Sequence, residues 1–181
     1  MGREKLSLEV GGLPLIAHVR NALSPSCREV LVVGGESLRL EQVRYVSNER
    51  AGGQGPLAGI EAGLAASNYD HVFVAAGDMP FLSPGLVGYL LERLGRGGFA
   101  AVIPHHGGRD HPLCGAYARA LLPGVSAALD AGARAVGQFL QGTGGVEYVG
   151  EELWRFGEPD LLLMNVNSPR DLERARRGAG R

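Results

Sequence analysis

The stretch Asp70-His71-Val72-Phe73-Val74-Ala75-Ala76-Gly77-Asp78-Met79-Pro80-Phe81-Leu82-Ser83-Pro84 decides the fold of this chain. Its unbroken apolar run has the length of a strand and ends in Gly-Asp, which is typical of a buried parallel strand. Gly77 lets the backbone turn, and Pro80 ends the strand. Because ligands of open α/β sheets bind at the carboxyl ends of the strands, we expect Asp78 to lie at such a binding edge.

Two interpretations of Asp78 follow from this position. A carboxylate at the edge of a sheet suits Mg²⁺, which favours one or two protein carboxylates together with the phosphates of a nucleotide. An aspartate before a turn that contains proline can also cap that turn through its side chain. The stretch by itself supports both interpretations equally.

The composition narrows the class of protein. The 181 residues have the length of one domain with a substantial core. Lysine and arginine number 18 and aspartate and glutamate 19, so we expect no nucleic-acid binding driven by overall positive charge. The sequence shows no apolar window of membrane-spanning length and no signal-peptide core, so we expect a cytoplasmic protein with no membrane partner. Cys27 and Cys114 lack the spacing of a zinc site or a disulfide framework.

Strand and helix patterns alternate along the chain, with no internal repeat or linker. This alternation predicts an α/β protein, a Rossmann-like three-layer sandwich around a mainly parallel sheet, in a single domain over residues 1–181. The predicted strands cover residues 6–10, 29–34, 43–46, 99–103, 113–118, 146–149 and 161–167, besides the run from Val72. The predicted helices cover residues 14–23, 84–94, 119–122, 125–129 and 136–140, besides segments that begin at Pro56 and Pro169.

Three loops are predicted to meet at one edge of this sheet. The first, residues 52–59, has small residues and free backbone N–H groups before a helix, which can face an anion or a base. The second is Gly77-Asp78, and the third, residues 165–169, ends an apolar strand with Asn165 and Asn167 on one face. Each loop also has a structural interpretation, because glycine loops commonly only turn the chain and asparagines commonly cap turns.

Other polar residues carry weaker signals. Lys5 adds a cation near the N-terminus, where a surface role is common for lysine. His105, His106 and His111 lie in one loop without further ligands, which is typical of surface or substrate-contacting groups. The sequence has no nucleophile elbow, no P-loop lysine and no dinucleotide-binding glycine motif. The motifs that would best indicate a hydrolase, a P-loop ATPase or a dehydrogenase are therefore absent.

Several longer motifs follow one another in a distinctive order. Residues 1–5, Met-Gly-Arg-Glu-Lys, are similar to the end of the signature Leu-Ala-Gly-Gly-x-Ser-x-Arg-Met-Gly-x-x-Lys. The later matches are Gly11-Gly12-Leu13-Pro14-Leu15, Gly55-Pro56-Leu57-Ala58-Gly59-Ile60, Gly77-Asp78-Met79-Pro80-Phe81, His111-Pro112-Leu113 and Asn165-Val166-Asn167-Ser168-Pro169. In this order, and over essentially the whole chain, the sequence resembles the molybdenum cofactor guanylyltransferase family.

The resemblance implies a fold of the nucleotidyltransferase type and a reaction. In that reaction, GMP is transferred from GTP to a phosphate of molybdenum-bound molybdopterin, and pyrophosphate is released. Mg²⁺ is the implied cofactor. GTP and the molybdopterin cofactor are the implied partners, together with molybdoenzymes and other proteins of cofactor biosynthesis.

The resemblance also implies roles for single residues. Asp78 would bind Mg²⁺ and the triphosphate and would act in catalysis together with Lys5. The residues implied in nucleotide binding are Lys5, Asn48, Gly55, Pro56, Leu57 and Asp78. The residues implied in binding the cofactor substrate are His111, Asn165 and Asn167, and one of the two amides could complete the coordination of the metal. Arg109 and Asp110 could contact the pterin or only solvate their loop.

Two features depart from the family pattern. The first strand of the family and its Gly-Gly nucleotide loop would precede Met1, so we expect the given chain to lack both and to leave a sheet edge open. Family members commonly carry an aspartate where this chain has Asn48, and an amide cannot pair with guanine as an anion. Two alternatives therefore stay open: cytidylyl transfer to the same cofactor, and a non-catalytic relative that binds the cofactor.

Overall fold

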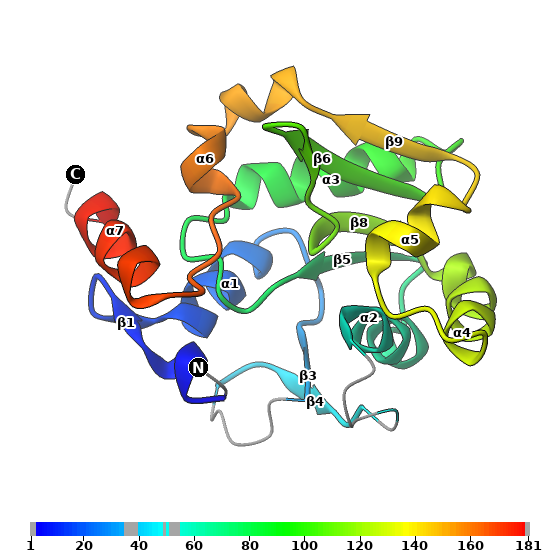
Figure 1. The fold of residues 1–181 in the computed structure, drawn as a ribbon, viewed down its shortest axis with the longest axis horizontal. Helices are drawn as coiled ribbons and strands as arrows, with labels where there is room; N and C mark the ends of the chain where they lie inside the picture. The colour runs from blue at the N-terminus through cyan, green and yellow to red at the C-terminus, as the bar shows by residue number, and fades with distance from the viewer. Residues whose placement is uncertain (1–2, 35–39, 49, 51–54, 180–181) are drawn as a thin grey trace.

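A layered α/β architecture forms the body of the protein. The computed structural model describes residues 3–34, 40–48, 50 and 55–179. A central sheet lies between two groups of helices, and the C-terminal helix lies beside the short N-terminal strands (Figure 1).

The main sheet contains the strand predicted from the opening stretch. Its order runs from β5 (His71–Ala75) through β8 (Cys114–Ala118) and β6 (Ala101–His106) to β7 (Arg109–Asp110), and β9 (Val146–Val149) pairs with β6. The pairings β5–β8, β8–β6 and β6–β7 are antiparallel, and β6–β9 is parallel.

The directions of these strands correct part of the prediction. β5, β6 and β9 run in the same direction, as expected for a mainly parallel sheet, but β8 and β7 run against them. The connection between β6 and β8 is too short for a crossover helix, so it returns as an antiparallel hairpin through Gly107 and Gly108. The polar segment 105–111, predicted as a loop, accordingly includes the end of β6 and all of β7.

Two smaller strand pairs flank the main sheet. β3 (Leu31–Val33) and β4 (Arg44–Val46) are parallel, and β1 (Glu9–Val10) and β2 (Leu13–Pro14) are antiparallel. Within the described residues, β5 pairs only with β8, so its other edge has no strand partner there. That a further strand precedes residue 1 stays a prediction.

One face of the main sheet is covered by α1 (Leu15–Leu23) and α3 (Pro84–Gly95). Both helices begin at or next to the proline that the sequence suggested. Leu86 and Leu90 of α3 are fully buried against Val102 of β6 in one core cluster. This cluster forms the first half of the hydrophobic core.

The opposite face is covered by α2 (Gly55–Ala66), α4 (Leu122–Asp130) and α5 (Val136–Gln141). In β6, Ala101 and Ile103 pack toward these helices, whereas Val102 packs toward α3. Such alternation is expected for a strand that is buried on both faces. The predicted three-layer sandwich is therefore confirmed.

The predicted strand 161–167 is wrong. The chain forms α6 (Pro159–Leu162) and then an irregular segment before α7 (Pro169–Ala179). Periodicity does not separate a short buried strand from a short buried helix, and Pro159 at the first helical position favours the helix.

Three short 3-10 helices lie at positions that the sequence did not predict as such. Residues 6–7, predicted as strand, belong to η1 (Arg3–Ser7), and β1 begins only at Glu9. η2 (Arg119–Leu121) is followed directly by α4, which begins at Leu122, and η3 (Glu151–Arg155) follows β9.

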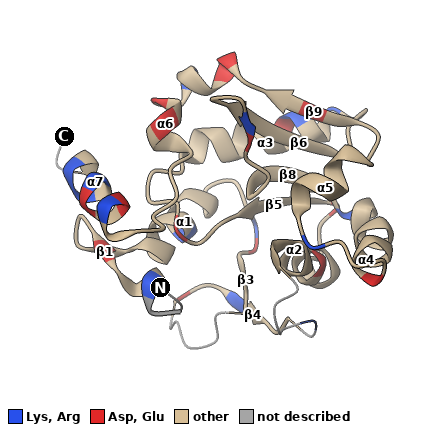
Figure 2. Ribbon diagram, in the orientation of Figure 1, with Lys and Arg blue, Asp and Glu red and all other residues tan. Residues whose placement is uncertain are grey.

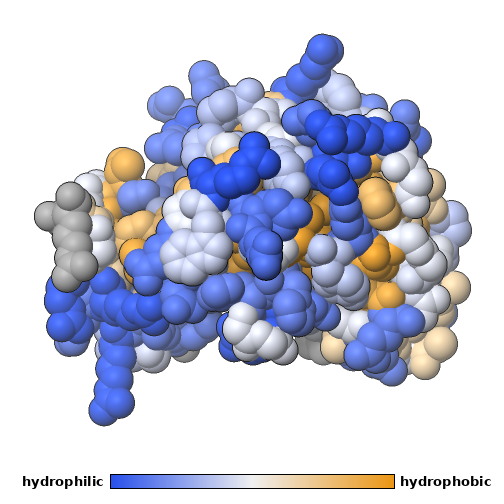
Figure 3. Space-filling view, turned by 90° about the horizontal axis from the view of Figure 1, so that it is seen from above, coloured by the Kyte–Doolittle hydropathy of each residue, from blue (hydrophilic) through white to orange (hydrophobic). Residues whose placement is uncertain are grey.

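The surface is mostly polar. Positive and negative residues are interspersed on the ribbon, with both signs present on α7 (Figure 2). On the face shown in Figure 3, hydrophilic residues separate small apolar patches. Among the described residues, every helix falls short of the length and hydropathy needed to cross a bilayer.

The packing of α3 on the sheet predicts a large effect for one substitution. Leu90 is 0% exposed, so Leu90→Ala leaves a cavity and should lower the free energy of unfolding by about 2–5 kcal/mol. Leu13→Ala, at a leucine that is 43% exposed, should change it by only about 0.5 kcal/mol. Urea unfolding of both variants measures the difference, and equal effects would contradict the assignment of Leu90 to the core.

Candidate active site

Asp78 follows β5 at a turn where close packing requires glycine. A Cβ on Gly77 would lie 2.8 Å from Cδ1 of Ile16 and 3.2 Å from Cδ2 of Leu6. Because α1 and η1 press on this turn, a side chain at position 77 would have to displace them. Asp78 itself is 9% exposed, so its carboxylate lies in a largely desolvated position.

The two carboxylate oxygens of Asp78 have different partners. The ammonium group of Lys5 donates to Oδ2, and Nδ2 of Asn165 donates to Oδ1 at 2.6 Å. The same ammonium group donates to Oδ1 of Asn167 at 2.7 Å. Burial of a carboxylate is costly unless it is paired and hydrogen-bonded, and both conditions are met here.

Three separate segments therefore meet at Asp78. Lys5 comes from η1, Asp78 from the turn after β5, and the two asparagines from the segment between α6 and α7. Lys5 is the single lysine among the 18 lysine and arginine residues of the chain. Its uniqueness can be seen from the composition alone, without any structural information.

A backbone hydrogen bond aligns the two asparagines. The N–H group of Val166 donates to the carbonyl oxygen of Asp78 at 3.0 Å, and the Val166 side chain is fully buried. Asn165 and Asn167 flank this anchor, and the side chains of both point toward the Asp78–Lys5 pair. The predicted pairing of these amides is thus present, although the segment is not a strand.

The start of α7 holds this segment from the other side. Asp171 accepts hydrogen bonds from the N–H groups of Asn167 at 3.0 Å and of Ser168 at 2.8 Å, and from the hydroxyl group of Ser168 at 2.8 Å. The Ser168 hydroxyl, followed by the Asn167 N–H group, lowers the pKa of Asp171, so the carboxylate is ionised at neutral pH. This cap at the N-terminus of α7 fixes the backbone of Asn167.

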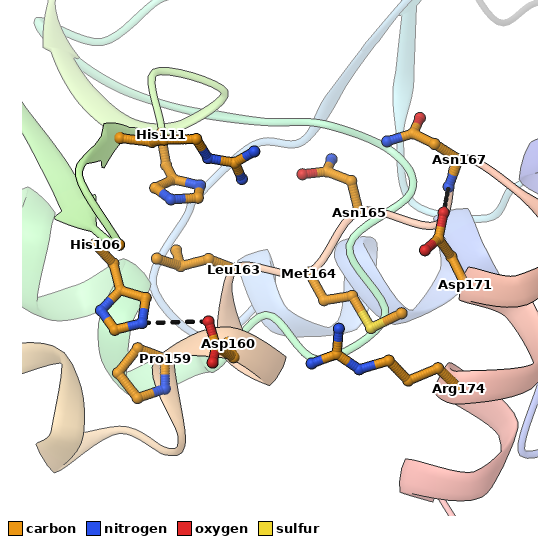
Figure 4. A pocket seen from close by; sticks show the side chains of 12 residues that line it. His106, His111, Pro159, Asp160, Leu163, Met164, Asn165, Asn167, Asp171 and Arg174 are labelled. Carbon is orange, nitrogen blue, oxygen red and sulfur yellow. Dashed lines mark hydrogen bonds and ion pairs between the residues drawn. The ribbon is translucent and has the colours of Figure 1, made fainter.

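Two adjoining cavities lie at the site. The first, called here the Asp78 cavity, has a volume of about 570 Å³ and includes Pro56, Asp78, Arg134 and Val136 in its wall. The second, called the Arg174 cavity, has a volume of about 650 Å³, and Figure 4 shows the side chains that line it. Both volumes fall in the range of small-molecule sites. The wall residues that the two cavities share are Arg109, His111, Asn165 and Asn167.

His111 stands at the border between these cavities. Its N–H group donates to the carbonyl oxygen of Pro104 at 2.8 Å, which ties the residue to β6. Burial, followed by the positive charge of Arg109, lowers the pKa of the His111 imidazole. The ring is therefore neutral at pH 7 and can donate one hydrogen bond and accept another.

The remaining residues predicted to bind the nucleotide do not all lie at the cavities. Pro56 lines the Asp78 cavity, and Gly55 begins α2 with φ of +72°. The Leu57 side chain is fully buried in the core, and its N–H group donates to the carbonyl oxygen of Arg134 at 3.4 Å. Asn48 accepts a hydrogen bond from the N–H group of Arg50 at 3.2 Å and lies outside the residues that line the two cavities. Residues 51–54 of the predicted glycine loop lie outside the described part of the chain.

Two arginines of the cavity walls were missed by the sequence interpretation. Arg134 lies in the wall of the Asp78 cavity, where its guanidinium group donates to the carbonyl oxygen of Ala133 at 2.8 Å. Arg174 lies in the wall of the Arg174 cavity, on α7. No local motif marks either residue, because only the packing of distant segments brings them to the site.

The chemistry of the site is that of hard oxygen donors and cations. Among the described residues, no three His, Cys, Asp or Glu side chains gather as a metal cluster. Asp78 and the amide oxygen of Asn167 suit a cation that takes its other ligands from a phosphate-bearing substrate, which fits Mg²⁺. Burial raises the pKa of Cys114, in the wall of the Asp78 cavity, to about 12, so this thiol is not a thiolate nucleophile at neutral pH.

Comparisons with known proteins identify relatives that are similar over nearly the whole chain. A protein of Pelotomaculum thermopropionicum described as a probable molybdenum cofactor guanylyltransferase is 36% identical over 180 residues, which cover 97% of this chain and 85% of that protein. The molybdenum cofactor guanylyltransferase of Cereibacter sphaeroides is 34% identical over 96% of this chain and 87% of its own length.

Solved structures share the architecture. Molybdopterin-guanine dinucleotide biosynthesis protein A of Archaeoglobus fulgidus superimposes with a TM-score of 0.83 at 29% identity, over 98% of this chain and 91% of that one. The 2-C-methyl-D-erythritol 4-phosphate cytidylyltransferase of Thermus thermophilus shares the fold, with a TM-score of 0.74 at 24% identity over 98% and 94% of the two chains. Residues 1–144 match the family model of the MobA-like NTP transferase domain. The chain therefore belongs to the MobA-like NTP transferase family and has a nucleotidyltransferase fold.

Proposed function

We propose that this protein transfers the guanylyl group of GTP to the phosphate of molybdenum-bound molybdopterin, with Mg²⁺ as cofactor. The observation that carries the proposal is the hydrogen-bonded cluster of Lys5, Asp78, Asn165 and Asn167, in which both asparagines line the two cavities and Asp78 lines one of them. The names of the relatives, which are at least 34% identical over nearly the whole chain, support the choice of donor and acceptor.

Two substrates need two adjoining spaces. A group-transfer reaction without a covalent enzyme intermediate requires donor and acceptor to be bound together, with their reacting atoms in line. The Asp78 and Arg174 cavities meet at His111, Asn165 and Asn167, so molecules bound in them would meet at the same wall. This arrangement supports direct transfer between two bound substrates.

The proposed reaction exchanges one phosphorus–oxygen bond for another. A phosphate oxygen of molybdopterin attacks the α-phosphorus of GTP, and the bond from this phosphorus to the bridging oxygen of the β-phosphate breaks. Pyrophosphate leaves with that bridging oxygen and the bonding electrons. Such a reaction needs neutralisation of charge and alignment more than a protein nucleophile.

The residues of the cluster divide this work. The ammonium group of Lys5, now shared between Asp78 and Asn167, can contact phosphate oxygens when a triphosphate enters the Asp78 cavity. Neutral His111 and the amide of Asn165 can donate hydrogen bonds at the border where the acceptor phosphate would lie. Asp78 and the amide oxygen of Asn167 would hold Mg²⁺, which neutralises phosphate charge when bound.

Replacement of Lys5 should impair transfer more than folding. In Lys5→Met, loss of the cation should lower the rate of guanylyl transfer about 10²- to 10³-fold. Lys5→Arg, which keeps the charge, should lose less. Transfer from radiolabelled GTP to molybdopterin by the full-length protein measures the rate, and thermal unfolding checks the fold. A folded Lys5→Met variant with the wild-type rate would contradict the assigned role.

GTP with Mg²⁺ should stabilise the folded protein through Asp78. At a concentration of one hundred times Kd, a ligand of the native state adds about 2.7 kcal/mol to the free energy of unfolding. Asp78→Asn should abolish most of this gain, and removal of Mg²⁺ with EDTA should do the same in the wild type. Asp70→Asn is the matched control, because Asp70 lies at the other end of β5 with a 93% exposed side chain.

The same unfolding measurement identifies the base. We expect GTP to stabilise the protein more than CTP at equal concentration. A larger effect of CTP would replace the guanylyl proposal by cytidylyl transfer. Equal unfolding curves with and without either nucleotide would contradict nucleotide binding by this chain.

A further inference from the structure

We propose that Arg174 determines the specificity for the acceptor by binding the negative charge of the acceptor phosphate from the wall of the Arg174 cavity. This inference rests on the proposed function, because it assigns the second substrate of that reaction to the second cavity. The ligand class is a phosphate monoester attached to a bulky heterocycle, which carries a charge of about −1.5 to −2 at neutral pH.

The charges in the wall of the Arg174 cavity are only partly compensated. Nε2 of His106 lies 3.3 Å from Oδ1 of Asp160, and Asp171 accepts hydrogen bonds in the cap of α7. Among the described residues, neither Arg109 nor Arg174 is in direct ion-pair contact with a carboxylate, and Arg174 acts on Asp171 only through its charge. The acidic side chains of the wall thus have partners, whereas the two guanidinium groups keep their hydrogen-bond donors for an anionic ligand.

The position of Arg174 is defined by the packing of α7. Ala175 is fully buried beside Val10 and Val166, and Arg176 donates to the carbonyl oxygen of Glu9 at 3.1 Å. Arg174 lies three residues after Asp171, so both project from one face of the helix. Figure 4 shows its guanidinium group pointing from α7 into the cavity, next to Met164. A helix that is held at its start and along its buried face presents this arginine from a rigid support.

The two cavities suggest a division between donor and acceptor. Asp78 lies in the wall of the first cavity and not of the second, whereas Arg174 lies in the wall of the second and not of the first. Arg109 belongs to both walls, so a phosphate at the border can lie between Arg109 and Arg174 while the heterocycle of the acceptor fills the rest of the Arg174 cavity. Arg174 should therefore influence the acceptor and leave GTP unaffected.

The experiment compares two arginines of α7. Arg174→Gln removes the cavity arginine, and Arg177→Gln removes an exposed arginine of the same helix that lies outside both cavity walls. We expect Arg174→Gln to raise the KM for molybdopterin about tenfold to a hundredfold, as for a lost hydrogen bond to a charged group. The KM for GTP should stay the same, Arg177→Gln should resemble the wild type, and Arg174→Lys should recover part of the affinity.

Direct binding separates this inference from the proposed function. Molybdopterin binding is measured without GTP, by quenching of pterin fluorescence, in the wild type and both glutamine variants. If the wild type binds molybdopterin but transfers no guanylate, the proposed reaction fails, and weaker binding by Arg174→Gln alone still supports the acceptor site. Equal binding by Arg174→Gln and Arg177→Gln would overturn the inference. A parallel loss of GTP affinity in Arg174→Gln would also overturn it.

Discussion

The carboxylate of Asp78 is held between the ammonium group of Lys5 and the amide of Asn165, and the rest of the site depends on this arrangement. The partners lie 73 and 87 residues away along the chain. A desolvated carboxylate is costly unless it is paired and hydrogen-bonded, and these two contacts supply both. The interaction therefore requires three distant segments to be placed correctly at once, and each of them is anchored by its own packing.

The sheet provides the first of these anchors. β5 lies beside β8, and helices cover both faces of the sheet, so the turn after β5 leaves the core at a defined point. The close approach of Ile16 and Leu6 to Gly77 shapes this turn. The segment with both asparagines is anchored by buried Val166, which is hydrogen-bonded to the Asp78 backbone, and by the Asp171 cap that begins α7. The segment that carries Lys5 is placed by Leu6, which packs against Gly77. Polar chemistry at the surface is thus supported by apolar packing below it.

The side chains at the two cavities show which chemistry this scaffold can support. A single carboxylate, a lysine and two amides offer charge neutralisation and orientation, which is what phosphoryl-transfer chemistry demands of a protein. The buried thiol of Cys114 has a raised pKa and offers no nucleophile. Membership of the MobA-like NTP transferase family is consistent with this combination. Arg109 and Arg174 add two guanidinium groups to the wall of the second cavity, beside the carboxylates of Asp160 and Asp171.

Apolar runs and prolines were sufficient to predict most helices and strands, because apolar spacing and the fixed φ angle of proline act within a short segment of the chain. Thus α1, α3 and β5 begin within one or two residues of the positions that the sequence indicates. The motifs that contain Asp78, His111, Asn165 and Asn167 were also visible, and the structure brings these residues together in one region. Lys5 was indicated by the match of residues 1–5 to the family signature, and it is also the single lysine of the chain.

Tertiary structure alone decided the rest. The run at residues 161–163 suits a strand or a helix equally, and the fold uses it as part of a helix and the connection after it. The direction of β8 follows from the short hairpin that joins it to β6. Arg174 has no local pattern that marks it, because its function would depend on where α7 packs. Local sequence thus determined which segments are buried and which residues carry charge, whereas long-range packing determined which charges meet.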